Sequence, residues 1–481
     1  MKTRTMLSLA LAGFALPNIA SATDGMDMEG YGPVAAAMGG ASMAYDNGTA
    51  AMMNNPATMA LMADGRRADL AYGYLGPDVT SSAGGVSSHS KADAFSMPAF
   101  GWAEKRNGFL YGVGIYGQGG MGTEYAGNSI QTLSNPGGQT PSPGLVNRSE
   151  VSVGRVIVPL AYDVTPDFRV GGSLDFVWAG MDLMMGISGN QFGDMVAALG
   201  GSQTYGSASG SLVNGLVAAM PGAISGIHWA YFDFSNQNDY TGQANGTGYA
   251  GKLGFVYRVN PKLMIGGTYQ SKTRLGDLRA DQATLSMSAD VTASNPWHYP
   301  AGTYTLPISG SIAVTGFQWP VTYGFGFAYQ ATDRLTLAAD YKRIDWSGIM
   351  GDFKMVFTAD NSPGNVALGF AGSVMNATIK QNWDDQNVLM LGGAYRVTPA
   401  LTLRAGLNVA NNPVPDKYEN PLFPATIRNH VTAGFGYVFS KASSVDFSVA
   451  HAFDTTVTSG FDGVTTSHAQ NNWQFLYSYR Y

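Results

Sequence analysis

Apolar and polar residues alternate along most of the chain, in segments of about ten residues that begin at residue 66. Between positions 401 and 409 the odd residues are Leu401, Leu403, Ala405, Leu407 and Val409, and the even ones are polar, charged or glycine. A period of two is typical of β-strands whose two faces meet different surroundings. The pattern therefore predicts an all-β protein.

The last of these segments alternates aromatic residues up to the C-terminus: Trp473, Phe475, Tyr477, Tyr479 and Tyr481. A last strand with a terminal aromatic residue is a known recognition feature of bacterial outer-membrane barrels. It indicates that the barrel-assembly machinery would recognise the chain through Tyr481.

Short and long breaks between the segments follow each other in strict order. The short breaks lie near residues 106–108, 165–167, 260–262, 331–333, 398–400 and 440–442. The long breaks lie near residues 76–92, 119–148, 189–246, 274–318, 349–385, 412–426 and 455–469. Six short and seven long connections join fourteen strands, as in an antiparallel transmembrane barrel with short turns on one side. A soluble β-sandwich or β-helix is the alternative, but it does not explain this order.

Composition narrows the class of protein further. Charged residues make up 12% of the chain, against about 25% in soluble domains, and the formal net charge is -6. No basic run exceeds two residues, which excludes the charge pattern of a nucleic-acid-binding protein. No apolar run approaches the length of about 18 residues that a transmembrane helix needs. Cysteine is absent, which excludes disulfides and thiolate metal sites.

Residues 1–22 have the pattern of a secretory signal peptide. Lys2 and Arg4 precede a short apolar stretch, and Ala20-Ser21-Ala22 provides a small-residue cleavage site. The mature chain would begin at Thr23. Export and strands together predict the outer membrane of a Gram-negative cell, where the barrel would contact membrane lipid and lipopolysaccharide.

Residues 23–65 lack the alternation and are rich in methionine, alanine and glycine. A segment this apolar must be buried, and we expect a partly helical hatch inside the barrel formed by residues 66–481. Methionine side chains are flexible and suit a surface that repacks around varied ligands. Thr23, Met26 and Met28 are therefore candidate ligand contacts. A hatch that only seals the barrel is equally compatible with this composition.

Several short motifs then resemble one family. Gly39-Gly40-Ala41 and Asn55-Pro56-Ala57 are similar to the hatch of the FadL family of outer-membrane channels for hydrophobic compounds, which includes toluene and xylene uptake proteins. Residues 335–347, 382–385 and 401–406, followed by Pro413-Val414-Pro415, add further matches in the C-terminal third. Between residues 119 and 320 only the spacing of strands matches, so the resemblance does not identify the loops that select the substrate.

The resemblance implies a monomeric fourteen-stranded barrel for long-chain fatty acids or related hydrophobic compounds such as alkanes or alkylbenzenes. It also implies capture among the outer loops, an internal site near the hatch and a lateral exit at a kinked third strand. In this chain the third strand, 109–120, contains Gly112, Gly114, Gly117 and Gly119, which permit a bulge or bend. Ordinary barrel curvature would explain these glycines as well.

The long connection after the fifth strand has helical spacing of apolar residues. Its side chains could form an outer apolar groove or could simply pack on one another. The candidates for the groove are Leu199, Leu212, Leu216, Met220 and Trp229.

Three cations fall on the interior face of the predicted strands: Arg404, Arg428 and Lys342. Such a cation could hold the carboxylate of a ligand. The sequence favours internal pairing with acids over this role: Asp24, Asp27 and Glu29 at the start of the mature chain are ready partners, as are Asp340 and Asp384. The sequence leaves both roles open.

The sequence offers no sign of catalysis. Its six histidines have no spacing typical of a metal site or a catalytic triad, so we expect a protein that is not an enzyme and uses no cofactor or metal. A general diffusion porin is the alternative function. It would have a polar open lumen, and its steady ion conductance would distinguish it from a gated transporter.

Overall fold

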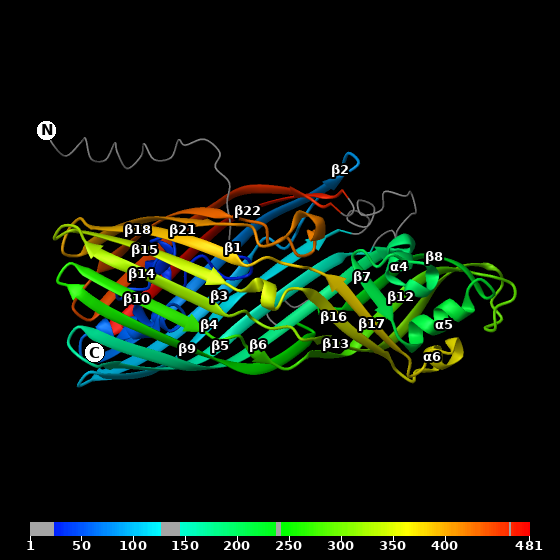
Figure 1. Ribbon diagram of the computed structural model, residues 1–481, viewed down its shortest axis with the longest axis horizontal. Helices are drawn as coiled ribbons and strands as arrows, with labels where there is room; N and C mark the ends of the chain where they lie inside the picture. Colours follow the sequence, from blue (N-terminus) through cyan, green and yellow to red (C-terminus); the bar gives the residue numbers. More distant parts are fainter. Residues whose placement is uncertain (1–23, 127–144, 237–241, 461–462) are drawn as a thin grey trace.

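The computed structural model describes residues 24–126, 145–236, 242–460 and 463–481, and its strands form one antiparallel sheet that closes into a barrel (Figure 1). The pairings run from β1 through β3, β4, β5, β6, β9, β10, β14, β15, β18, β19, β20 and β21 to β22. Strand β22 then pairs with β1, from Arg67 opposite Arg480 to Ser82 opposite Thr465. Closure removes the free sheet edge that lipid would not tolerate.

The strands have the following bounds: β1 Gly65–Ala83, β2 Val86–His89, β3 Phe95–Arg106, β4 Phe109–Tyr125, β5 Asn147–Asp163, β6 Phe168–Ser188, β7 Gly206–Ser209, β8 Ile224–Phe234, β9 Ala244–Asn260, β10 Leu263–Gln270, β11 Arg274–Leu275, β12 Leu278–Val291, β13 Gly302–Thr315, β14 Thr322–Gln330, β15 Leu335–Ile344, β16 Asp352–Ala359, β17 Val374–Lys380, β18 Gln386–Arg396, β19 Leu401–Ala410, β20 Asn429–Val438, β21 Ser443–Thr458 and β22 Thr465–Arg480. The helical elements are α2 Pro33–Ala36, η2 Gly48–Met52, η3 Pro56–Leu61, α4 Gly189–Met195, η4 Ala197–Leu199, α5 Ser211–Ala219, η5 Trp346–Gly348, α6 Pro363–Leu368 and η6 Asp416–Tyr418. No helix among the described residues is long and apolar enough to cross a membrane.

The whole sheet contains 22 strands rather than the predicted fourteen, although the closed ring of pairings from β1 to β22 itself passes through fourteen of them. The difference arises where long loops were expected, because the connections themselves form hairpins that pair with one another. Strand β12 pairs with both β8 and β13, β13 pairs with β16, and β17 pairs with β7. Backbone groups in a long connection need hydrogen-bond partners. The alternation of apolar and polar residues is the same in a strand of the barrel wall and in a hairpin of a long connection, so the sequence pattern does not distinguish the two.

The short connections lie at one end of the barrel. The first residues of β1 and the last residues of β22 lie at the same end. In the turn between β3 and β4, Asn107 and Gly108 have φ values of 52° and 78°, as the tight turns of hairpins require. At the same end Arg66 and Tyr481 exchange two backbone hydrogen bonds, of 2.9 and 3.0 Å. The aromatic last strand is therefore paired along both sides up to its terminus.

The outer surface of the wall is apolar. In β14, Tyr323, Phe325, Phe327 and Tyr329 are exposed, whereas the residues between them are buried or partly buried. Leu174 of β6 is 78% exposed. Soluble monomers rarely expose continuous apolar patches of this kind, whereas an apolar belt is what a barrel presents to lipid.

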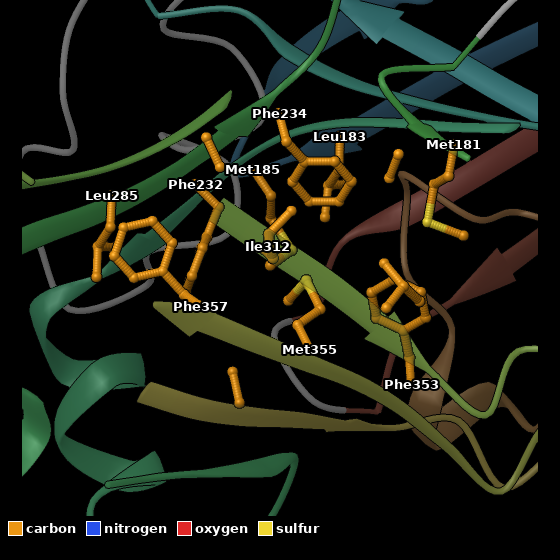
Figure 2. Packing of buried hydrophobic residues seen from close by; sticks show 14 of the residues in the cluster. Met181, Leu183, Met185, Phe232, Phe234, Leu285, Ile312, Phe353, Met355 and Phe357 are labelled. Carbon is orange, nitrogen blue, oxygen red and sulfur yellow. The ribbon is translucent and has the colours of Figure 1, made fainter. Parts of the chain in front are cut away.

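The inside of the barrel is packed toward the long-loop end. Figure 2 shows Leu183 and Met185 of β6 close to Phe232 and Phe234 of β8, with Met355 of β16 nearby, and all of these side chains are buried. The elements that carry these side chains lie far apart in sequence. This cluster forms the apolar floor beneath the loops.

The N-terminal residues 24–62 lie inside the barrel (Figure 1, dark blue). Helix α2 contacts β20, β21 and β22, whereas η3 contacts β5, β6 and β9. Because these strands belong to different parts of the ring, the segment that joins the two helices crosses the lumen. We call residues 24–62 the hatch. The predicted signal peptide and Thr23 lie outside the described residues.

Candidate functional site

The Asn55-Pro56-Ala57 motif fixes the hatch to the wall. Asn55 caps η3, and its Oδ1 accepts a hydrogen bond of 3.1 Å from the Ala57 amide. Its Nδ2 donates to the carbonyl oxygens of Met43, at 2.8 Å, and of Phe255 in β9, at 3.1 Å. A Cβ at Gly254 would lie 2.0 Å from Asn55 Oδ1, so only glycine permits this approach. In this structure the motif anchors the hatch.

Carboxylates of the wall hold the hatch at two further places. Asp340 of β15 accepts backbone hydrogen bonds from Ser42, at 2.5 Å, and from Met43, at 2.9 Å. Asp69 of β1 accepts from the amide and the hydroxyl of Thr49, at 2.8 and 2.9 Å. Hydrogen bonds to charged groups are the stronger kind, so these contacts hold the middle of the hatch.

The first residues of the hatch carry three buried acids with different partners. Asp24 forms an ion pair with Lys342 of β15. Asp27 Oδ1 accepts hydrogen bonds from Tyr31, at 3.0 Å, and from two side chains of the barrel, Gln118 Nε2 at 3.2 Å and Trp319 Nε1 at 2.9 Å. The hatch is therefore tied to opposite parts of the barrel through its acidic end.

Glu29, unlike Asp24, has no ion-pair partner among the described residues. Its Oε2 accepts a hydrogen bond of 3.3 Å from Asn472, while its Oε1 accepts none from another residue. Burial raises the pKa of Glu29 to about 7, because the surroundings solvate the carboxylate poorly and Asp24 adds a like charge. Glu29 therefore changes its charge near neutral pH.

The three predicted cations have separate environments. Lys342 pairs with Asp24 of the hatch, and Arg404 of β19 pairs with Asp446 of the wall, with Nη1 and Oδ1 2.8 Å apart. Arg428 directly precedes β20, and its Nε is buried without a hydrogen-bond partner. The structure thus does not gather these side chains into one anion site.

Strand β4, the third strand of the wall in chain order, is irregular at its glycines. Its register with β5 shifts between Gly117 and Gly119, which marks a bulge. Gly119 forms a β-bridge with Asp27, and the neighbouring amide of Gly120 donates to the Met26 carbonyl at 3.1 Å. The bulge of the wall is therefore where the start of the hatch docks.

The other predicted glycines of β4 lie closer to the short-turn end. A Cβ at Gly112 would lie 2.4 Å from the carbonyl oxygen of Trp102, and one at Gly114 would lie 2.6 Å from the sulfur of Met52. Both glycines permit close packing, the first across the β3–β4 pairing and the second against the hatch.

Pairing between β3 and β4 covers only part of their length. It extends from Arg106 opposite Phe109 to Phe100 opposite Ile115. Residues 95–99 of β3 still pair with β1, and β4 from Gly117 onward pairs with β5. Pro98 has no amide hydrogen to donate in this stretch. We call this stretch without backbone pairing, between residues 95–99 and 116–122, the wall opening; the side chains of Met97 and Phe95 reach across it to Gly117 and Gly122.

A cavity with an empty volume of about 920 Å³ adjoins the wall opening. Its lining includes residues 25–29 of the hatch, 95–97 of β3, 119–122 of β4 and 150–152 of β5. Met26 and Met28, predicted as ligand contacts, are among them. We call it the inner cavity.

A second pocket, of about 990 Å³, lies among the loops and is called the outer pocket. Met185, Phe232 and Met355, which Figure 2 shows on three different strands, form part of its wall. Lys380 and Lys417 add positive charge, and Asp194 and Glu419 add negative charge. The sequence analysis did not select these residues, although Phe353, Met355 and Phe357 alternate as lining residues of a strand would.

The predicted groove residues lie elsewhere. Leu212 and Leu216 of α5 and Trp229 of β8 are buried, Met220 packs at the edge of the same cluster, and Leu199 of η4 is 38% exposed. The lining of the outer pocket contains none of the five. In this structure α5 thus directs its leucines into the core.

A closed barrel with an apolar outer belt and a lumen crossed by its own N-terminal segment defines a plugged outer-membrane β-barrel. The chain belongs to the family described as "Outer membrane protein transport protein (OMPP1/FadL/TodX)", whose model matches residues 14–478. It is an outer-membrane protein of a channel and transporter family.

Solved structures and a sequence relative agree with this assignment. The toluene transporter TodX of Pseudomonas putida has 27% sequence identity and a TM-score of 0.77, with 95% of this chain and 99% of that chain covered. The toluene transporter TbuX of Ralstonia pickettii has 31% identity and a TM-score of 0.73, with coverage of 94% and 99%. A 47 kDa outer membrane protein of Pasteurella multocida (strain Pm70) is 25% identical over 50% of this chain and 52% of its own length. The chain spans about half or less of the curated relatives that it matches.

Proposed function

We propose that the protein mediates passive uptake of hydrophobic compounds, such as fatty acids, alkanes or alkylbenzenes, across the outer membrane. The observation that carries this proposal is the inner cavity, which lies between the hatch and the wall opening. Transfer of a hydrophobic molecule into water costs free energy. A route that leads from a cavity directly into the bilayer avoids this cost and therefore suits such a cargo. The names of TodX and TbuX as toluene transporters support the same class of cargo.

The route would have three stages. The outer pocket, at the long-loop end, captures the compound on its methionine and phenylalanine side chains. The inner cavity holds it against Met26 and Met28 of the hatch. The compound then leaves sideways through the wall opening into the membrane, where the bulge at Gly117–Gly119 interrupts regular pairing.

The start of the hatch is the proposed gate. Residues 26 and 27 are docked on the bulge through the bridge to Gly119 and the hydrogen bond from Gly120. A ligand that fills the inner cavity touches the same segment and would compete with these contacts. The ligand would bind more tightly to the protein with the hatch undocked than with the hatch docked, and this difference in affinity would couple opening to ligand binding.

The expected assembly and partners complete the proposal. The protein would act as a monomer, contact lipid and lipopolysaccharide, and enter the membrane through recognition of Tyr481. Leu199 and its neighbours would shape the approach to the outer pocket. A general diffusion porin is disfavoured, because the hatch crosses the lumen and most of its residues are buried.

Deletion from the native host tests this function. We expect slower uptake of at least one labelled class among fatty acids, alkanes and alkylbenzenes, and recovery when the intact gene is returned. A small sugar serves as the control, because a plugged barrel would not carry it. Unchanged uptake of all three hydrophobic classes would refute the proposal.

A further inference from the structure

The charges around the inner cavity are all of one sign. Among its described lining residues the ionisable side chains are Asp27, Glu29 and Glu150, together with His468, and there is no lysine or arginine. The remainder is largely apolar, with Met26, Met28, Leu75, Val79, Met97 and Met121 as examples. The cavity thus combines an apolar wall with carboxylates.

These carboxylates are held in place by other groups of the protein. Glu150 Oε2 lies 2.6 Å from Arg148 Nη2, and the same guanidinium places Nη1 2.8 Å from Glu124 Oε2. Arg148 is thereby shared between two carboxylates and offers little positive charge to the cavity. Glu29 is only 1% exposed, and its Oε1 accepts no hydrogen bond from another residue.

Two interior cations of the barrel, Lys342 and Arg155, are also engaged by acids, and a third, Lys252, donates to the carbonyl oxygen of Met53. Lys342 pairs with Asp24, and Arg155 Nη1 lies 2.8 Å from Asp175 Oδ2. A carboxylate entering the inner cavity would lose its hydration without gaining a cation. Such a transfer is strongly unfavourable, whereas an uncharged hydrophobic molecule gains from the same apolar wall.

We propose that Glu29 and Glu150 make the inner cavity reject carboxylates, so that the cargo is an uncharged hydrophobic compound rather than a fatty acid anion. This inference rests on the proposed uptake function and narrows its substrate class. The lining of the outer pocket carries Lys380 and Lys417 together with Asp194 and Glu419, so its charges are of both signs and selection falls on the inner cavity.

Matched pairs of probes test the inference with the full-length protein. Tritiated p-xylene is compared with 4-methylbenzoate, and 1-dodecanol with dodecanoate, at pH 7.4. Binding to purified protein in detergent and uptake by cells that carry or lack the protein are measured. We expect the neutral member of each pair to bind at least about tenfold more tightly, and only its uptake to depend on the protein.

A single substitution should reverse the preference. Met121→Lys places a cation in the cavity, and Met121→Gln is a matched variant of similar length without charge. Met121→Lys should increase carboxylate binding by about tenfold or more, as an opposite charge in a poorly solvated site would, while Met121→Gln should not. Outer-membrane levels and heat-modifiable migration of both variants confirm that they fold.

The outcomes separate the two claims. Carboxylates that bind as well as their neutral partners, or carboxylate binding that Met121→Lys does not improve, would overturn the inference while leaving uptake intact. If none of the four probes shows protein-dependent binding or uptake, the proposed function fails and the inference fails with it.

Discussion

Two acidic residues at the start of the hatch, Glu29 and Asp24, have few hydrogen-bond or ion-pair partners in the barrel. Glu29 is buried against Asn472 with one oxygen left without a partner from another residue, and Asp24 relies on Lys342. A buried carboxylate is stabilising when a cation or hydrogen-bond donor faces it, and destabilising when it carries an unpaired charge. The start of the hatch is therefore the part of the molecule most sensitive to its ionisation.

Glu29 should make hatch docking depend on pH. Its folded pKa is about 7, above the ordinary 4.5, so its favourable contribution is complete below about pH 4.5 and is lost as the pH rises through 7. The loss amounts to at most about 3 kcal/mol, at 1.36 kcal/mol per pKa unit. Hydrogen exchange of residues 24–62, corrected for intrinsic rates, should therefore be faster at pH 8 than at pH 5.

Two variants control that measurement. Glu29→Gln should remove most of the pH dependence, and Glu104→Gln, at an exposed ion pair with Arg66, should retain it. Equal exchange at both pH values in the unaltered protein would contradict the assignment of Glu29.

For the interior charged residues, the sequence predicted which side chains face the lumen better than it predicted their ion-pair partners. Lys342 and Asp24 were both recognised as candidates for internal pairing, and the structure brings them together. Arg404 was a candidate to pair with the hatch but faces Asp446, two strands away. Alternation tells which face a side chain occupies, but the partner depends on the register between strands, which one sequence does not contain.

Among the secondary-structure elements, β4 links the wall to the hatch. Its glycines were expected to permit a bend, and the structure has a bulge between Gly117 and Gly119. The docking of Met26 and Asp27 on that bulge was not predicted, because no local signal connects residues more than 90 positions apart. Similarly, hairpins in the long connections changed the strand count, since strands of wall and loop share the same alternation.

Gly119→Ala should release the start of the hatch. A Cβ there would lie 2.0 Å from the Met26 carbonyl oxygen, which is backbone and cannot turn aside, so the segment must shift at a cost of about 1 to 3 kcal/mol. We expect faster hydrogen exchange in residues 24–30. Gly117→Ala is the matched control, because its Cβ would meet only the flexible end of Met97.

Equal exchange in the two glycine variants would contradict this assignment of the bulge. The same result would weaken the proposed gate, because the gate requires the contact between the hatch and Gly119. Folding of both variants is checked by their thermal unfolding in detergent.

The whole molecule is a closed barrel with an apolar outer belt and a lumen crossed by its own N-terminal hatch. Closure, the outer apolar belt and the short-turn end follow from periodicity and loop lengths, and the structure agrees with each. The position of the outer pocket does not follow from them. Its residues come mainly from β6, α4, β8, β16, β17 and the loop before β20, and only the folded barrel brings these together.

Ion conductance should distinguish this barrel from an open pore. The purified protein in planar bilayers should be nearly silent, because buried hatch residues cross the lumen. Large, steady open channels in the unaltered protein would indicate a general diffusion porin instead.

Sealing the wall opening tests the lateral route most directly. The chain has no cysteine, so Phe95→Cys with Gly122→Cys provides a unique pair for a reversible thiol cross-linker across the opening, because the Phe95 ring lies 3.0 Å from where a Cβ at Gly122 would be. Arg106→Cys with Phe109→Cys, which face each other where β3 and β4 are already paired, is the control. Uptake of p-xylene by cells is then measured before cross-linking, after it, and after reduction.

Cross-linking the first pair should stop uptake and reduction should restore it, while the control pair transports throughout. Uptake that continues at the original rate with the opening sealed would contradict the lateral route.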